Sequence, residues 1–577
     1  MTNKTNILRY YFLFIFCLTL FSSHSQDVEN VVKGITTSIK EKPISMSGNI
    51  GASAIFNTIS GIDQRRDPFN WNLNANINFS IAGIINAPFS FYLAPGNDTY
   101  NLPSYRFAGI SPSYKWIKLH IGDRSMNFSR YSFAGHTFFG IGTELTPGRF
   151  QISGMYGRLQ RAVPEDINVR QNIEPAFKRM AYGARIAYEG KNEDLAFTLF
   201  HAWDDINSIP RLTMNPEIRP ANNTILGLEF SRSFGDKVGL DIETAYSAYN
   251  RDSQAEASEE LSGLRYTMLG LFKPTASSNF RMAFNTNVNY LISKRTTLSI
   301  GFERVDPNYR TLGSLFFNND YENYTGAVAT NIANGKLTLS VNAGIQKNNL
   351  DGKQLNAANR FIGSINANYM ISKRMAINAS YSNFKNTNKL RFVDSRPDVL
   401  FDSLVLALVN QNLNLSTMYQ LTEDRSMNLV ASFSFQNADQ IEDDIVLNDR
   451  NTTFYLGNIS LQKTYKERDL SWALSFQASY ADIANIQNVL YAPTISVRKK
   501  FFDKKLVTSV STSFISQFSQ GEFANSVINV IGSFKYRLLK NQTIGLSTRF
   551  AKRGAPQNSG KPSFNEFTGR LNYGLSF

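Results

Sequence analysis

The feature that most constrains the fold of this chain is an alternation of apolar and small polar residues that continues from Pro43 almost to the C-terminus. A period of two residues places the two kinds of side chain on opposite faces of a β-strand. In residues 336–346, for instance, Val341 belongs to the apolar set and its neighbour Asn342 to the polar set. The chain is therefore predicted to be all-β.

The length of these runs separates two kinds of all-β fold. Soluble β-sandwiches also alternate, but their strands are usually about 5–6 residues long. The runs here reach the roughly 9–11 residues that cross a bilayer on a tilt, and their polar faces consist mainly of Ser, Thr, Asn, Gln and Gly, which suits a wet lumen. The aromatic share of 13% is high and the charged share of 18% is low for a soluble surface. We expect residues 45–577 to form a single large transmembrane antiparallel β-barrel.

Two kinds of connection separate the runs. Short polar turns begin at a Tyr, are followed at once by a new run, and occupy residues 290–295, 369–374, 419–424 and 536–541. We expect these turns to be periplasmic hairpins with the Tyr at the membrane interface. Longer stretches rich in Asn, Asp, Gly and Pro are the candidate extracellular loops, and they comprise residues 161–179, 204–223, 250–278 and 386–409.

The number of runs predicts the size of the barrel. Counting between turns gives about 26 strands, with a range of about 22–28. An even number of strands places both chain termini on the periplasmic side.

The N-terminus is typical of a secretory signal peptide. Lys4 and Arg9 supply the positive charge, residues 10–21 form the apolar core, and small residues precede Gln26. We therefore expect residues 1–25 to be removed by cleavage.

Cys17 is the only cysteine in the sequence. Lipid attachment at Cys17 is an alternative to simple cleavage, but bulky residues precede this cysteine where a lipoprotein has small ones. Without Cys17, the mature chain can form neither a disulfide nor a thiolate metal site.

The formal charge of the chain is +14, and removal of residues 1–25, which hold two cations and no acid, leaves +12. The cations are scattered, with no run of five or more. A lumen that faces anionic solutes, or a surface in contact with lipopolysaccharide and membrane lipid, explains this better than nucleic-acid binding does.

The last residues give the most specific signal. Five residues share one face of the terminal strand, and they are Gly569, Leu571, Tyr573, Leu575 and Phe577. A last strand that ends on an aromatic residue resembles the C-terminal assembly signal of bacterial outer-membrane proteins. The resemblance implies a location in the cell outer membrane and the barrel-assembly machinery as a partner. The richness in Asn, Tyr and Phe and the Ser-Gln junction also resemble proteins of the Bacteroidota.

The expected barrel is similar to that of TonB-dependent receptors, which thread an N-terminal plug domain through the barrel. Only residues 26–44, a short periplasmic segment of 19 residues (44 − 26 + 1), precede the first expected strand here. Domains below about 40 residues rarely fold unaided. The chain thus departs from those receptors, and we expect either inward-folded loops or a partner protein to fill the lumen.

The most unusual connection is residues 122–140, which begin and end with glycine. It combines five Phe and Tyr rings with Arg124, Arg130, Tyr131 and His136. Arginine binds carboxylate, phosphate or sulfate through two parallel hydrogen bonds, and aromatic rings suit a site that is shielded from water. We hypothesise that this segment folds inward and constricts the pore. An aromatic extracellular cap without a ligand is the alternative.

Other polar clusters are weaker candidates. Five acids, Asp439, Glu442, Asp443, Asp444 and Asp449, fall in one expected loop. Their spacing is not that of an EF-hand, so a solvated loop is favoured over a Ca²⁺ site.

Three histidines remain after signal removal, namely His120, His136 and His201. None belongs to a His-Glu-x-x-His metal motif, and the sequence has no Gly-x-Ser-x-Gly elbow. A Ser-His-acid site built across strands stays open as an alternative. We expect no enzyme activity, no metal and no cofactor.

The sequence thus predicts an outer-membrane pore that moves solutes or macromolecules. The alternative is a translocon or scaffold barrel that a partner plugs, as in secretion, export or surface-assembly complexes. The transported substrate does not follow from the sequence.

Overall fold

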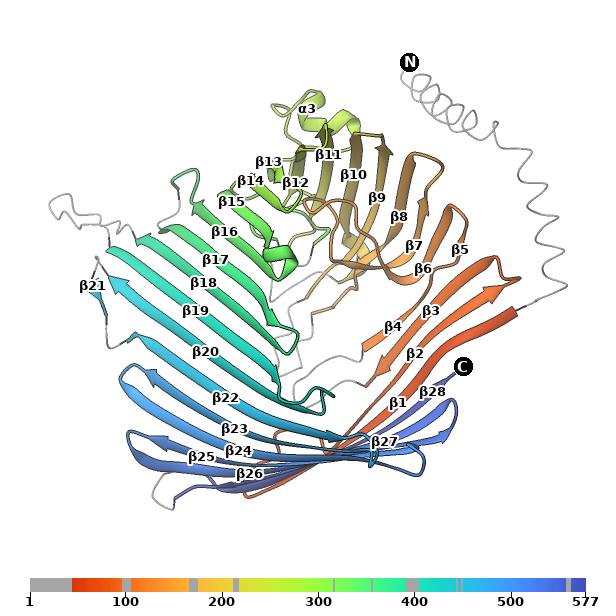
Figure 1. Ribbon diagram of the computed structural model, residues 1–577. Helices are drawn as coiled ribbons and strands as arrows, with labels where there is room; N and C mark the ends of the chain where they lie inside the picture. The colour runs from red at the N-terminus through yellow and green to blue at the C-terminus, as the bar shows by residue number, and fades with distance from the viewer. Residues whose placement is uncertain are drawn as a thin grey trace.

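A computed structural model describes residues 44–95, 105–165, 175–210, 217–314, 317–353, 356–390, 404–442, 445–447, 450–556 and 562–577. These residues form one antiparallel sheet that closes on itself into a barrel (Figure 1). The barrel has 26 strands around its circumference, because the two-residue strands β5 and β21 only extend or flank their neighbours. The prediction of an all-β barrel of about 26 strands is confirmed.

The strands alternate in direction around the ring. In the first half they are β1 (Ile44–Ser60), β2 (Phe69–Ile81), β3 (Ile85–Ala94), β4 (Tyr105–Ile110), β5 (Ser113–Tyr114), β6 (Ile117–Ser125), β7 (Thr137–Leu145), β8 (Phe150–Gln160), β9 (Lys178–Glu189), β10 (Glu193–Asp205), β11 (Asn222–Phe234), β12 (Val238–Asn250), β13 (Ser278–Ser293) and β14 (Thr296–Val305). In the second half they are β15 (Tyr321–Ile332), β16 (Leu337–Asn348), β17 (Asn356–Ser372), β18 (Met375–Leu390), β19 (Leu404–Gln420), β20 (Met427–Glu442), β21 (Ile445–Val446), β22 (Thr452–Tyr465), β23 (Leu470–Ile483), β24 (Ile486–Phe501), β25 (Leu506–Ser519), β26 (Glu522–Leu539), β27 (Gln542–Gly554) and β28 (Phe564–Ser576).

The first and last strands close the ring. β1 pairs with β28 in an antiparallel register that sets Gly51 opposite Gly574. Beyond the end of β28, Phe577 exchanges two backbone hydrogen bonds with Gly48, of 2.8 and 3.0 Å. Figure 1 shows the red β1 beside the dark blue β28. The C-terminal aromatic residue is therefore part of the seam that joins the two ends of the sheet.

The two ends of the barrel differ in their connections. We call the end where β1 begins and β28 finishes the terminal end, and the opposite one the loop end. Every connection at the terminal end has six residues or fewer, the longest being residues 421–426 between β19 and β20. At the loop end, 27 residues (251–277) join β12 to β13 and 11 residues (126–136) join β6 to β7. This is the asymmetry of short periplasmic turns and long extracellular loops expected of an outer-membrane barrel.

The predicted connections agree closely with the structure, with two corrections. The loop predicted at residues 386–409 is too long, because β18 continues to Leu390 and β19 already starts at Leu404. Asp439 and Glu442 were expected in a loop but lie in β20. Both errors arise where polar residues occupy strand positions near the rim, so composition alone suggests a loop. Asp443, Asp444 and Asp449 lie outside the described residues.

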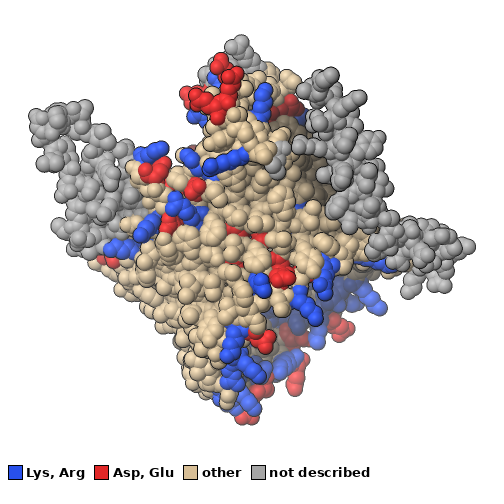
Figure 2. Space-filling view, turned by 90° about the horizontal axis from the view of Figure 1, so that it is seen from above, with Lys and Arg blue, Asp and Glu red and all other residues tan. Residues whose placement is uncertain are grey.

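The two faces of the sheet have different chemistry. On the outer face of the C-terminal strands, large apolar side chains are 38–47% exposed, and they include Val497, Val510, Phe534, Leu546 and Leu571. The inner face of the same strands is lined mainly by small polar residues such as Ser509, Ser533 and Ser547. Figure 2 shows a broad surface with few charged residues, and charged residues gather at its borders. Lipid is a better environment than water for such an outer face.

Little of the described chain is helical. The helices are α3 (Leu264–Thr267), η1 (Ile206–Ser208), η2 (Met268–Gly270) and η3 (Ala333–Gly335). None of the helices among the described residues has the length and apolar character needed to span a membrane. The expected signal peptide, residues 1–25, lies outside the described residues, as does the N-terminal segment up to residue 43.

Candidate constriction inside the barrel

Two connections from the loop end fold against the inner face of the barrel. They are residues 126–136, between β6 and β7, and the connection between β14 and β15, described at residues 306–314 and 317–320. The aromatic side chains Phe128, Tyr131 and Phe133 of the first connection are at most 4% exposed. Burial of this degree shows that the segment is packed against protein and does not form an exposed cap.

The wall beneath residues 126–136 is apolar and spans β7–β14, which we call the packed arc. Phe133 is fully buried and stacks on Phe200 of β10, with ring centroids 5.5 Å apart and an interplanar angle of 15°. The buried residues that form one cluster with it on the wall are Phe138, Met155, Ala181, Phe200, Ala202, Ile225, Ala245, Ala283 and Val305. Outward-facing neighbours such as Phe197 are half-exposed, so β10 is apolar on both faces.

The two connections also bind each other. The hydroxyl of Tyr309 donates a 2.7 Å hydrogen bond to the carbonyl of Tyr131, and the hydroxyl of Thr311 donates to the carbonyl of Ser132. Phe133 and Gly313 form a parallel bridge. The first connection was predicted from its aromatic residues, but the second, which contributes a fully buried Tyr309, was not.

Glu303 of β14 is the polar centre of this assembly. Its carboxylate, whose side chain is 12% exposed, accepts hydrogen bonds from Arg130, from the Tyr131 hydroxyl at 2.8 Å and from the Tyr321 hydroxyl at 3.0 Å. Asn323 donates a fourth, of 3.2 Å. A carboxylate with so many donors fixes the ends of several side chains at once, and the removal of one partner leaves others unsatisfied.

Burial sets the protonation of the groups in the connections. It raises the pKa of Tyr131 well above the ordinary value for a phenol, and the nearby Glu303 carboxylate raises it further. Burial likewise raises the pKa of Tyr309. It lowers the pKa of His136, which is 8% exposed, so this imidazole is neutral at neutral pH. Tyr131, Tyr309 and His136 are thus neutral at neutral pH.

The four predicted constriction residues fall in different places. Tyr131 and His136 are buried within the connection, and Arg130 reaches from it to Glu303 with half of its side chain exposed. Arg124 was expected in the connection but lies in β6, where its guanidinium donates to the carbonyl oxygens of Pro88 and Gly109. Its role there is to tie β6 to β3 and β4.

The flanking glycines have a different role from the one expected. Gly122 and Gly140 lie within β6 and β7 and pair with each other across the two strands. A Cβ at Gly140 would lie 2.1 Å from the carbonyl oxygen of Tyr156, and one at Gly122, where φ is +90°, would lie 2.4 Å from that of Ala108. They permit close approach of neighbouring backbone and are not hinges of the connection.

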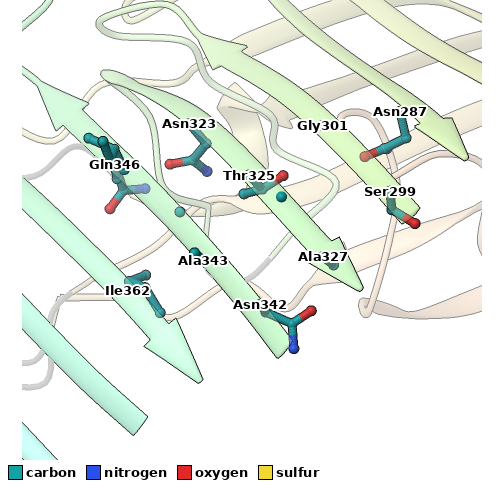
Figure 3. Close-up of a pocket in the computed structure, with 13 residues that line it drawn as sticks. Asn287, Ser299, Gly301, Asn323, Thr325, Ala327, Asn342, Ala343, Gln346 and Ile362 are labelled. Atoms are coloured by element: carbon teal, nitrogen blue, oxygen red, sulfur yellow. The ribbon is translucent and has the colours of Figure 1, made fainter. Parts of the chain in front are cut away.

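Farther along the wall the inner face is not apolar. A hollow of about 330 Å³ opens over β13–β17, where small residues such as Gly301 and Gly344 leave room. The amide side chains of Asn323, Asn342 and Gln346 project from β15 and β16 around it (Figure 3). Neutral amides and hydroxyls of this kind suit water or sugar hydroxyl groups.

A second polar chain lies on the inner face near the terminal end. Ser111 and His120 Nδ1 are 3.0 Å apart, and His120 Nε2 is 3.0 Å from Glu144. Lys118 also binds Glu144, at 3.0 Å. A Ser-His-acid site was an alternative left open by the sequence, and Ser111, His120 and Glu144 have the residue types for such a site. Ser111 is 6% exposed, however. These hydrogen-bonded side chains connect the short β4 and β5 to β6 and β7, so their role is structural.

Four of the five predicted assembly-signal residues lie in β28, and Phe577 follows directly after it. Leu571, Tyr573 and Phe577 are 47%, 37% and 39% exposed, on the apolar outer side. Gly569 and Leu575 belong to the same alternating set in β28. Within the described part of the chain, no group of three His, Cys, Asp or Glu side chains is placed to hold a metal ion.

No protein-family model matches this chain, and no curated protein sequence matches it. Among solved structures it is similar to the ferric yersiniabactin uptake receptor FyuA from Yersinia pestis, at 9% identity and a TM-score of 0.39 over 93% of this chain and 80% of that one. It is also similar to the copper transporter OprC, at 8% identity and a TM-score of 0.38 over 93% and 80% of the two chains. The P pilus usher (PapC) translocation pore is matched at 10% identity and a TM-score of 0.29 over 92% and 100%. These similarities assign no cargo, ligand or partner to this chain.

Proposed function

We propose that this chain is a large channel of the cell outer membrane, and that residues 126–136 together with the connection after β14 constrict its lumen. The observation that carries the proposal is the chemistry of a closed barrel: exposed apolar side chains outside, a polar inner face, and two loop-end connections packed inside. Transport, not catalysis, is the function that this arrangement supports.

The size of the barrel explains why a constriction is needed. A circular barrel of 26 strands spaced about 4.8 Å apart and tilted about 40° would have a backbone diameter of roughly 50 Å. Side chains of the wall shorten the free diameter by only about 10–15 Å. A lumen of that width would pass folded proteins, so material inside it must set the size of what crosses.

Exchanging residues 126–136 for an Asn-Gly turn tests this proposal. Ser125 and Thr137 are direct cross-strand partners, so a two-residue turn can close the β6–β7 hairpin. The variant should show a higher single-channel conductance in planar bilayers and admit larger neutral sugars. Removal of residues 259–262, in another connection at the same end, is the matched control and should change neither. Unchanged conductance in a correctly folded turn variant would contradict the proposal.

The second candidate is a translocon or scaffold barrel that a partner protein plugs. The inner face of β16–β28, which we call the open arc, favours it, because side chains such as Arg498 and Arg549 on that face are exposed. A pulldown from detergent-solubilised membranes separates the two. A stoichiometric partner that reduces the conductance would favour the plugged barrel over the stand-alone channel.

A further inference from the structure

The inner face of the last five strands is strongly basic. Its cationic residues, which we call the cationic ladder, are Arg498, Lys500, Lys535, Arg537, Arg549, Arg553 and Arg570. Two carboxylates share this face, Glu566 and, at the loop-end rim, Glu522. Seven cations against two acids leave a net charge of +5 on one side of the lumen. The apolar residues that alternate with them, such as Phe550 and Leu571, face outward.

The strand register arranges the ladder in successive rows along the wall. Lys500 and Lys535 lie in one row, joined through Val507. The next row toward the loop end holds Arg498 and Arg570, joined through Ser509, Ser533 and Ser547.

Three other members extend these two rows. Arg549 lies in the row after that of Arg570, and Arg553 two rows further toward the loop end. Arg537 lies one row nearer the terminal end than Lys535. Rows on one face are about 6.7 Å apart, so the ladder follows roughly 33 Å of strand, most of the thickness of a membrane.

Most of these cations are accessible to a ligand, although Arg549 donates a 3.5 Å hydrogen bond to the amide oxygen of Asn529 and Arg553 lies over the Phe564 ring. The serines in the row of Arg498 and Arg570 are too short to cover a guanidinium group, and their hydroxyls can donate to an oxyanion. Arg498, Lys535, Arg537, Arg549 and Arg570 are exposed. Among the described residues, Lys500 is the one member of the ladder in an ion pair, at 3.5 Å from Asp469.

The charges of the packed arc are arranged differently. There Arg179 binds Asp204 and Arg185 binds Glu229, each at 2.8 Å, and Arg130 binds Glu303. These three cations are each neutralised by a carboxylate of the wall, whereas the members of the ladder other than Lys500 have no ion pair among the described residues. Arginine offers paired donors that match phosphate, sulfate and carboxylate groups.

We propose that the cationic ladder is a binding track for elongated solutes that bear phosphate, sulfate or carboxylate groups at intervals. This inference rests on the proposed channel and names the chemical class of its cargo. The amides and hydroxyls along the neighbouring wall would contact the uncharged parts of such a solute.

Ion selectivity tests the track in the channel itself. In a KCl gradient the native protein should conduct Cl⁻ in preference to K⁺. The double variant Arg549→Gln, Arg570→Gln should move the reversal potential toward zero, and Arg549→Lys, Arg570→Lys should retain the native value. Lys499→Gln with Lys552→Gln removes the same charge from the opposite face of β24 and β27 and should have no effect. The proposal would be overturned if the native protein showed no preference for anions. It would also be overturned if the Arg→Gln and Lys→Gln double variants shifted the reversal potential equally.

Binding to the folded protein in detergent tests the track without any current. Dextran sulfate should bind and neutral dextran of equal length should not, with affinity roughly tenfold weaker in the Arg→Gln double because two charge-assisted contacts are lost. Equal weakening in the Lys→Gln double would refute the track. Competition by inorganic phosphate would show that single oxyanions occupy it, and resistance to phosphate would restrict the ligand to longer polyanions. A protein that binds dextran sulfate but conducts no ions would overturn the proposed channel and leave the track intact.

Discussion

The packed arc and the open arc of this barrel have similar residues on their outer faces and residues of opposite polarity on their inner faces. Both present large, partly exposed apolar residues outward, as Phe197 does in β10 and Leu546 does in β27. Inward, the packed arc presents Phe200 and Ile225, both fully buried, where the open arc presents serines and exposed arginines. The residues on the inner face of a strand therefore differ with their surroundings: they are large and apolar where they contact packed protein, and small or charged where they face the lumen.

The largest expected difference between the arcs is in the cost of removing an inner side chain. Phe133→Ala should destabilise the packed assembly by about 3–5 kcal/mol, because a fully buried ring leaves a cavity. Asn342→Ala in the open arc should change stability by no more than about 0.5 kcal/mol, since the side chain lies beside the open hollow. Denaturant titration of the refolded protein, followed by limited proteolysis, measures both. Equal costs would mean that the assembly is not packed as described.

The outer and inner faces of one open-arc strand can be compared in the same way. Val341→Arg should cost about 2–4 kcal/mol if Val341 lies near the middle of the bilayer, whereas Asn342→Arg should be tolerated in a wet lumen. The register supports the assignment, because Val341 pairs with Val328 and Ile365, while Asn342 pairs with Ala327 and Ser364. Folded yields in lipid vesicles report the difference. Tolerance of both changes would show that the two faces are wrongly assigned.

Much of this fold follows from the sequence because both faces obey simple rules in the open arc. There the alternation is regular, and three of the turns predicted after Tyr lie where strands β17, β19 and β26 end; the fourth lies at the end of β13 in the packed arc. The identity of residues 122–140 as an unusual connection also follows, since five rings would be costly to leave in water. Four of the five rings pack inside the barrel, while Phe139 is 49% exposed, and the role of the segment as a constriction stays a prediction.

The rest could not be derived from local patterns. The connection after β14 escaped notice because its contribution depends on Tyr309 and Thr311 meeting Tyr131 and Ser132, nearly 180 residues away. One feature of the sequence did indicate packing inside the barrel: Phe200 places a large apolar residue among the inward-facing residues of β10. The cationic ladder could not be recognised in the sequence either, because its members come from four strands and lie near one another only through the pairing of those strands. The Bacteroidota-like composition stays a prediction.

Glycines on the inner face should show a smaller difference between the arcs. A Cβ at Gly183 of β9 would lie 2.3 Å from the ring of Phe128, which is itself buried, so Gly183→Ala should cost about 1–3 kcal/mol through overpacking. At Gly545 of β27 the nearest atom is 3.9 Å away, and Gly545→Ala should be neutral. Denaturant titration and protease sensitivity of residues 126–136 measure the pair. Equal effects would show that Phe128 does not occupy the space over Gly183.

The smallest expected effect is a dependence of conductance on pH that arises from His136, in the connection of residues 126–136. All three histidines after residue 25 precede β11, and residues 202–577 contain none. Burial lowers the pKa of His136 below its ordinary 6.5, and the nearby Arg179 lowers it further. Protonation therefore favours a released connection over the packed one, so the stabilisation from His136 is present above about pH 6.5 and is lost as the pH falls through the lowered pKa. Single-channel conductance should rise reversibly between about pH 7 and about pH 5, and this rise should be smaller in His136→Gln. The same rise in both proteins would exclude His136 as its origin.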